Sequence, residues 1–221
     1  MKISPLCLSV LLPCALLSAE TLPFADDFKN HLDSGWSWVR ENPKNWRIVP
    51  EGLQIMIEPG NMWGSQNDGR NILWRPLPSS TNGVAFELTV QNVPTNQYEQ
   101  VDLVWYLDDS NMVKLGLELV DGKLSIVMGR EEDDKTRTIA LLTTDLTTVR
   151  LRLELSDASI RGSFRAPASD LWQVAGTCEL PIVPGLKPKV AIQCYQGAPG
   201  VEHWATLSHF TMEASKEAVR K

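Results

Sequence analysis

The sequence predicts an all-β protein, a two-sheet antiparallel jelly-roll sandwich, on the strength of three observations. Apolar and polar residues alternate with a period of two through most of the chain from Val84 onward, as expected for strands with one buried face. Short clusters of turn-forming residues separate these runs, and no long segment has the apolar period of a helix. Many short strands in one continuous pattern favour two sheets packed face to face.

The chain opens with a segment typical of a secretory signal peptide. Residues 1–19 contain Lys2, a short apolar stretch and a small residue at Ala19, and we expect cleavage after Ala19. The apolar stretch is too short to span a bilayer. Cys14 would suit lipid attachment, but the preceding residue is Pro13, where a small residue is needed. The mature chain is therefore expected to be secreted or to lie in the periplasm or cell envelope, without a membrane span.

One β-domain is expected over residues 20–214, followed by a polar tail at 215–221. A chain of this length can bury a sizeable core. Its formal net charge is −6 at pH 7, so it has no basic surface of the kind that binds nucleic acid or anionic lipid. Nucleic acid is therefore not an expected partner.

The expected strands follow one another along the second half of the chain. Each carries an apolar residue at every second position, and they span residues 84–90, 101–106, 112–120, 123–130, 149–155, 159–165, 171–177, 189–195 and 204–213. Turn signals lie between them at Asp108–Asn111, Asp121-Gly122, Asp157-Ala158 and Pro184-Gly185. Asp121-Gly122 between two alternating runs is the clearest hairpin signal.

Acidic residues crowd between Val104 and Lys123, and the alternation divides them into two groups. Those at positions 108, 109 and 121 fall in turns. Glu118 falls within a strand, on the same outward face as Lys114 and Gly116, while the apolar residues between them face the core. The strand acid is thus a candidate for chemistry, and the turn acids are expected to build turns.

Several segments together resemble a known family. They read DDF (26–28), GWSWVRENPKNWRI (35–48), LQIMIEPGNMWG (53–64), NILWRPLP (71–78), VDLVWYLDDSNMVKLGLELVDGK (101–123) and IVMGREEDD (126–134). The chain resembles an uncharacterised bacterial and fungal domain family of the concanavalin A-like lectin/glucanase superfamily, part of which carries a regulation-of-enolase label. It is also similar to the β-sandwich domain of some family 43 xylosidases. The resemblance implies a concanavalin A-like jelly roll and leaves the function open, since that fold hosts lectins, hydrolases and structural modules.

The catalytic motif of the superfamily's glucanases is absent. Those enzymes carry E-x-D-x-x-E on one strand, and the acidic segments 99–102, 118–121 and 130–134 all lack that spacing. Glycosidases need two carboxyl groups flanking the scissile bond. The absence of the motif favours a protein that is not an enzyme and makes a glycoside hydrolase the least favoured alternative.

The outward strand faces carry the candidate ligand-binding residues. Aromatic rings that can stack on a sugar would alternate there with charged groups that can bond its hydroxyls; the candidates are Trp38, Arg40, Tyr106, Lys114, Glu118 and Arg130. We therefore expect a non-catalytic, lectin-like carbohydrate-binding module that holds a glycan on its concave sheet face. The alternatives are a structural surface with charges paired across strands and a protein-interaction domain of the cell envelope.

Two smaller features remain open. Cys178 and Cys194 both follow the parity of apolar positions, so in an exported protein they could form a disulfide or stay as two buried thiols. Asp26 and Asp27, near the first expected strand, could help to bind a structural Ca²⁺ or could cap a solvated turn. No other cofactor is expected.

Overall fold

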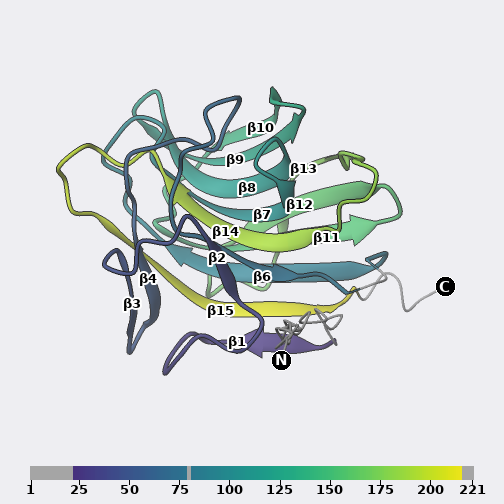
Figure 1. Cartoon of the computed structure of the whole chain (residues 1–221), viewed down its shortest axis with the longest axis horizontal. Helices are drawn as coiled ribbons and strands as arrows, with labels where there is room; N and C mark the ends of the chain where they lie inside the picture. The colour runs from purple at the N-terminus through teal and green to yellow at the C-terminus, as the bar shows by residue number, and fades with distance from the viewer. Residues whose placement is uncertain (1–21, 79–80, 216–221) are drawn as a thin grey trace, which may run out of the picture.

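The protein is an antiparallel β-sandwich of two sheets (Figure 1). The computed structural model describes residues 22–78 and 81–215, so the signal-peptide prediction for residues 1–19 and most of the predicted tail lie outside the described residues. The two antiparallel sheets confirm the predicted sandwich. In the described residues, no helix is long and apolar enough to cross a membrane.

The first sheet has seven strands in the order β10-β9-β8-β7-β14-β5-β2. Its strands are β2 (Ser37–Val39), β5 (Ile72–Pro76), β7 (Gln100–Asp108), β8 (Asn111–Val120), β9 (Lys123–Glu132), β10 (Lys135–Thr143) and β14 (Lys189–Tyr195). The chain runs from β7 to β10 as consecutive hairpins. Strand β14 then pairs with β7 from the other side, so β7 and β8 lie at the middle of the sheet.

The second sheet has eight strands, seven of them in the order β13-β12-β11-β6-β15-β4-β3, and β1 also pairs with β15. Its strands are β1 (Phe24–Asp26), β3 (Trp46–Val49), β4 (Gly52–Met56), β6 (Val84–Gln91), β11 (Thr148–Ser156), β12 (Ser159–Arg165), β13 (Gln173–Glu179) and β15 (Trp204–Ala214). Ser215, the first residue of the predicted tail, is buried and bonds the Gly83 carbonyl.

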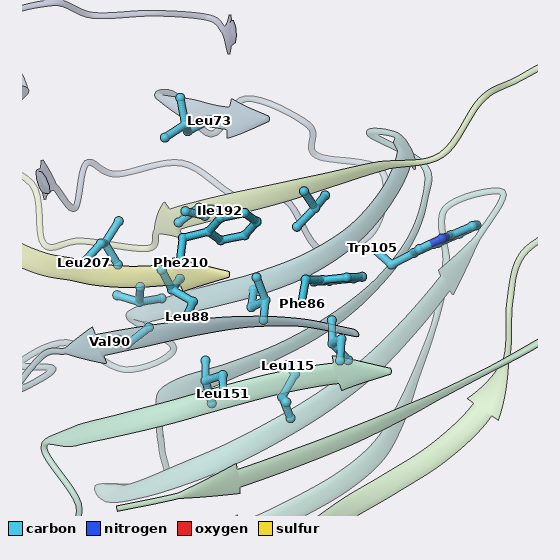
Figure 2. Close-up of a cluster of buried hydrophobic side chains, with 14 of the residues drawn as sticks. Leu73, Phe86, Leu88, Val90, Trp105, Leu115, Leu151, Ile192, Leu207 and Phe210 are labelled. Carbon is cyan, nitrogen blue, oxygen red and sulfur yellow. The ribbon is translucent and has the colours of Figure 1, made fainter. Parts of the chain in front are cut away.

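The main core fills the space between the sheets. Figure 2 shows side chains from both sheets meeting there, including Leu88 and Leu151 from the eight-stranded sheet and Leu115 and Ile192 from the seven-stranded one. These residues occupy alternate strand positions, as the period-two pattern predicted. The opposite positions therefore form the outer face of each sheet.

The turns predicted from local sequence signals are present in the structure. The β8–β9 hairpin turns at Asp121 and Gly122, whose φ angles are +50° and +71°, the left-handed values that a type I′ turn requires. Strand β10 was not predicted. It lies at the sheet edge, and most of its residues are exposed, so its sequence does not alternate.

The two cysteines are free and buried, which corrects the disulfide prediction. Cys178 lies on β13, an edge strand that faces β9 and β10, and Cys194 lies on β14 in the other sheet. Two strands stand between β9 and β14, and neighbouring strands are about 4.8 Å apart. The Cα atoms therefore lie beyond the roughly 7 Å that a disulfide can bridge. Strand parity correctly predicted that both thiols face the core. It carries no information about which strands lie next to each other.

Candidate functional site

The outer face of the seven-stranded sheet is covered by a long loop. Residues 57–71, between β4 and β5, cross this face and insert Met62 and Trp63 above the strands. Around Met62 lies a second, smaller apolar cluster, separate from the main core; its buried members also include Ile72, Val104, Tyr106, Met112, Ala191 and Tyr195. The outer face, where the alternation placed the candidate ligand-binding residues, therefore carries a second packed layer.

Hydrogen bonds hold the loop to the sheet. The Gly64 amide donates to both carboxylate oxygens of Glu131 on β9, at 3.1 Å each. Arg40 Nε donates to the Gly69 carbonyl oxygen at 2.6 Å, and the Gln196 amide donates to the Gly60 carbonyl oxygen at 3.1 Å. These contacts fix the position of Trp63.

Beside the loop a pocket of about 460 Å³ opens over strands β7 to β10. It combines aromatic, polar and apolar groups; the lining residues are Asn61, Trp63, Tyr98, Gln100, Lys114, Glu118, Val120, Val127, Thr138, Leu141 and Gln196. This volume falls in the usual range for small-ligand sites.

Trp63 forms one wall of the pocket because β9 has a glycine beneath it. A Cβ built at Gly129 would come within 2.4 Å of the Trp63 ring, so only glycine lets the indole approach the sheet at this point. Tyr98, which is 48% exposed, also lines the pocket. The site therefore offers two aromatic side chains to a bound molecule.

The floor of the pocket is a buried charged network centred on Lys114. The side chains of Lys114 and Glu118 are 3% and 8% exposed, and Lys114 Nζ lies 3.3 Å from Glu118 Oε2. Lys114 also donates to Gln100 Oε1 and to the Tyr195 hydroxyl, and it lies 4.7 Å from the centroid of the Trp63 ring. One cation thus connects three strands and the covering loop.

Two further carboxyl groups lie behind this network. Burial raises the pKa of Asp102 to about 7, although Lys114 partly offsets the effect. Neither Asp102 oxygen has a hydrogen-bond partner of good geometry, even though the Tyr195 hydroxyl lies near enough to lower the pKa slightly. Burial likewise raises the pKa of Glu131 to about 7, opposed by the Gly64 amide. Both acids therefore titrate near neutral pH.

The structure brings some predicted residues together and separates others. Lys114 and Glu118 lie in the pocket, as predicted from strand parity. Tyr106 lies on the same sheet face but in the apolar cluster, where its hydroxyl donates to Asp109 Oδ1 at 2.6 Å. Arg40 bonds the same carboxylate, with Nη1 2.6 Å from Asp109 Oδ2. Asp109, expected only to build a turn, in fact anchors both residues.

Trp38 does not lie on the outer face of the seven-stranded sheet. It packs against the main core and stacks on Trp46 with a centroid distance of 5.1 Å, because its partner across the strands is the inward-facing Leu73. Arg40 has a φ of +50°, which breaks the alternation that placed it beside Trp38. The shared face inferred for these two residues was therefore wrong.

Arg130 also points away from the pocket. On β9 it has the parity of the core residue Met128, and its Nε donates to the Glu179 carbonyl oxygen on β13 at 2.8 Å. It therefore links the edges of the two sheets. Its assignment to the outer face was an error of parity.

At the predicted calcium residues, protein donors already bond Asp26. Its carboxylate accepts hydrogen bonds from the Phe28 amide at 2.8 Å, the Asp33 amide at 3.0 Å and Trp36 Nε1 at 2.9 Å. Asp27 Oδ1 lies 2.9 Å from His209 Nδ1. The described residues contain no cluster of three or more His, Cys, Asp or Glu suited to a metal. Calcium binding at Asp26 and Asp27 stays a prediction.

Sequence reasoning missed several pocket residues. Trp63 and Tyr98 lie in loops, where no strand parity applies, and Gln100 directly precedes the predicted strand over 101–106. One signal was available. The glycines at 116 and 129 interrupt alternating strands, and a glycine within a strand often marks a close approach by another group.

Comparison with solved structures supports the fold assignment. A mutant of the GH43 protein BlXynB from Bacillus licheniformis matches with a TM-score of 0.75 and 17% identity, over 86% of this chain and 39% of that one. A xylan β-1,4-xylosidase from Bacillus halodurans matches with a TM-score of 0.74 and 16% identity, over 91% and 41%. The chain thus spans about two fifths of these proteins.

A carbohydrate-binding module, CBM66 from Bacillus subtilis, has the same fold over nearly its whole length. Its TM-score is 0.52 at 14% identity, over 81% of this chain and 95% of the module. No family model matches the sequence, and no curated protein does. The chain therefore has a β-sandwich fold like the one in these GH43 proteins and in CBM66.

Proposed function

We propose that the protein is an exported, non-catalytic carbohydrate-binding module whose site is the pocket over β7 to β10. The observation that carries the proposal is the composition of that pocket, with Trp63 and Tyr98 beside Gln100 and the carboxylate of Glu118. A sugar presents an apolar ring face that stacks on aromatic side chains and hydroxyls that need polar partners. The likeness in fold to a carbohydrate-binding module is consistent with this reading.

The distribution of carboxyl groups supports a binding role over hydrolysis. Glu118 is the one acid among the residues that line the pocket in the described part of the chain. Asp102 and Glu131 are fully buried behind it. A glycosidase needs two carboxyl groups that reach opposite sides of the scissile bond, and a single accessible acid suits recognition better.

A protein-interaction role is the second candidate, favoured by one surface. Exposed apolar side chains gather in the segment around β13; Leu171 is 79% exposed, Val174 59% and Ile182 76%. Such groups commonly lie at protein contacts. The surface belongs to the eight-stranded sheet, so variants there and in the pocket can be tested separately.

A glycan array on the mature chain tests the proposal, followed by calorimetry on any sugar that binds. Tyr98→Ala is the most informative variant, because an exposed side chain can be removed without loss of the fold. Loss of one stacking contact worth about 1 kcal/mol weakens binding roughly five-fold. The matched control is Val93→Ala, which removes another exposed loop side chain outside the pocket. Equal affinity for Tyr98→Ala and the parent, or an array without any binding, would reject the proposed site.

The export part of the proposal has its own test. It rests on the signal-like layout of residues 1–19. Sequencing the N-terminus of the protein recovered from an expressing cell should give a chain that begins near Glu20. A chain that retains Met1 would contradict export through cleavage.

A further inference from the structure

We infer that the pocket selects sugars by charge: it favours those whose polar groups are hydrogen-bond donors, amino sugars above all, and excludes those that carry a carboxylate. The inference rests on the proposed carbohydrate-binding function and adds the class of sugar. It follows from which polar groups of the pocket still have capacity to bond a ligand.

Lys114, the cation of the pocket, has no donor left to offer. An ammonium group has three N–H bonds, and three acceptors within the protein occupy them: Gln100 Oε1, Glu118 Oε2 at 3.3 Å and the Tyr195 hydroxyl at 3.4 Å. The Trp63 ring covers the same group. Lys114 therefore organises the floor and does not bond an anionic ligand, contrary to the role that its outward parity suggested.

The other cations of this sheet face are also committed elsewhere. Arg40 bonds Asp109 and the Gly69 carbonyl, and Lys189 Nζ donates to the Leu107 carbonyl oxygen at 2.9 Å. Of the residues that line the pocket in the described part of the chain, Lys114 alone is positively charged. A sugar carboxylate would find no guanidinium or ammonium partner there.

The floor of the pocket, in contrast, still has a hydrogen-bond acceptor that a ligand can use. Glu118 Oε2 accepts from Lys114, and no described residue donates to its Oε1. Behind it lies the fully buried Asp102, which is near the Tyr195 hydroxyl and adds negative charge when it ionises. A ligand ammonium or hydroxyl would supply the missing donor, and a ligand carboxylate would face repulsion in a partly buried site, where charges are poorly screened.

The experiment compares matched sugars by calorimetry at pH 7 in low salt. The probes are neutral sugars in the gluco, galacto and manno configurations, each with its 2-amino form and its uronic acid. We expect the amino sugar to bind about ten-fold or more tightly than the uronic acid of the same configuration, because a charge-assisted hydrogen bond contributes about 1.5 kcal/mol or more. Added salt should reduce this ratio.

Glu118→Gln is the decisive variant, since it keeps the shape of the side chain and removes its charge. The amino-to-uronic ratio should fall several-fold, while Glu51→Gln, in the exposed turn between β3 and β4, should leave the ratio unchanged. If Glu118→Gln does not fold, the salt dependence of the amino-to-uronic affinity ratio in the parent protein still tests the charge selection. A uronic acid that binds as well as its amino counterpart overturns the charge selection alone. Failure of every sugar, neutral ones included, overturns the proposed function with it.

Discussion

Two strands of this protein have nearly the same sequence and yet build different surfaces. Residues 113–119 on β8 read VKLGLEL, and residues 149–155 on β11 read VRLRLEL. The two strands lie in opposite sheets (Figure 1). In both, the apolar residues turn toward the core and the charged residues turn outward, so the period-two pattern alone predicts the same structure twice.

The surroundings of the charged residues differ. On β11, Arg150 and Arg152 both bond Glu87, at 2.6 and 2.8 Å, and their side chains remain 20% and 16% exposed. On β8, the loop over residues 57–71 covers the face, and the side chain of Lys114 is 3% exposed. The first arrangement is a partly solvated set of ion pairs, and the second is the floor of a pocket.

The central position of each heptapeptide helps to explain the difference. β8 has Gly116, and a Cβ there would lie 1.7 Å from Asp102 Oδ1. β11 has Arg152 at the same place, which extends over its sheet to Glu87 and lies 5.7 Å from the Trp172 ring centroid. Glycine therefore admits the Asp102 carboxylate onto the sheet face, whereas Arg152 pairs with the buried carboxylate of Glu87 and keeps its own side chain partly exposed.

The largest expected difference comes from removing the first cation of each strand. Lys114→Met leaves Glu118 and Asp102 buried without their positive partner, which should lower the free energy of unfolding by about 3–5 kcal/mol. Arg150→Met breaks a partly exposed pair and should cost about 1 kcal/mol or less. Urea unfolding followed by tryptophan fluorescence measures both. Similar losses in the two variants would mean that the burial of Lys114 does not matter energetically.

The central residues give the next largest effect. Gly116→Ala places a methyl group where Asp102 Oδ1 and the Val101 carbonyl oxygen lie, at 1.7 and 2.7 Å from the new Cβ, and should destabilise by about 1–3 kcal/mol. Arg152→Ala should have a smaller effect because its ion pairs are partly exposed. Thermal unfolding at fixed pH compares them. A neutral Gly116→Ala would show that the Asp102 side chain can move aside.

The buried acids should make stability depend on pH. The pKa values of Asp102 and Glu131 rise from 3.8 and 4.5 to about 7, so between these limits the folded protein holds protons that the unfolded chain has released. Stability should therefore fall as the pH rises from about 4 through 7, by about 1 kcal/mol for each group between pH 6 and 8. Urea unfolding at both pH values tests this. Asp102→Asn should flatten the dependence, and the exposed control Asp145→Asn should not.

The smallest effect on stability is expected at Gly129, where binding should respond more. Gly129→Ala pushes a Cβ to within 2.4 Å of the Trp63 ring. The indole lies at the surface side of the sheet and can shift, so unfolding should change by about 1 kcal/mol, while affinity for any sugar identified on the array should fall several-fold. Gly122→Asn, at a turn with open space and a positive φ, is the control. If the indole is displaced and the affinity for sugar is unchanged, Trp63 is not part of the binding site.

The sequence by itself was enough for the fold class and for much of the core. Alternation over residues 84–90, 149–155 and 189–195 coincides closely with β6, β11 and β14, because a strand with one buried face must repeat every two residues. It also placed Lys114 and Glu118 together, since both belong to one strand. The same rule failed at Arg40, where a positive φ interrupts the alternation, and at Arg130, where the parity was assigned wrongly.

Only the tertiary structure decided that one outer face becomes a pocket. Trp63 and Tyr98 come from loops, Glu131 and Gly64 meet across 67 residues of chain, and Cys178 and Cys194 share an inward parity but not a neighbourhood. The residue pattern of a strand shows which of its two sides is buried, because that pattern is contained in the strand's own sequence. What covers it, and which charges are left with capacity to bond a ligand, depends on contacts between segments far apart in the sequence.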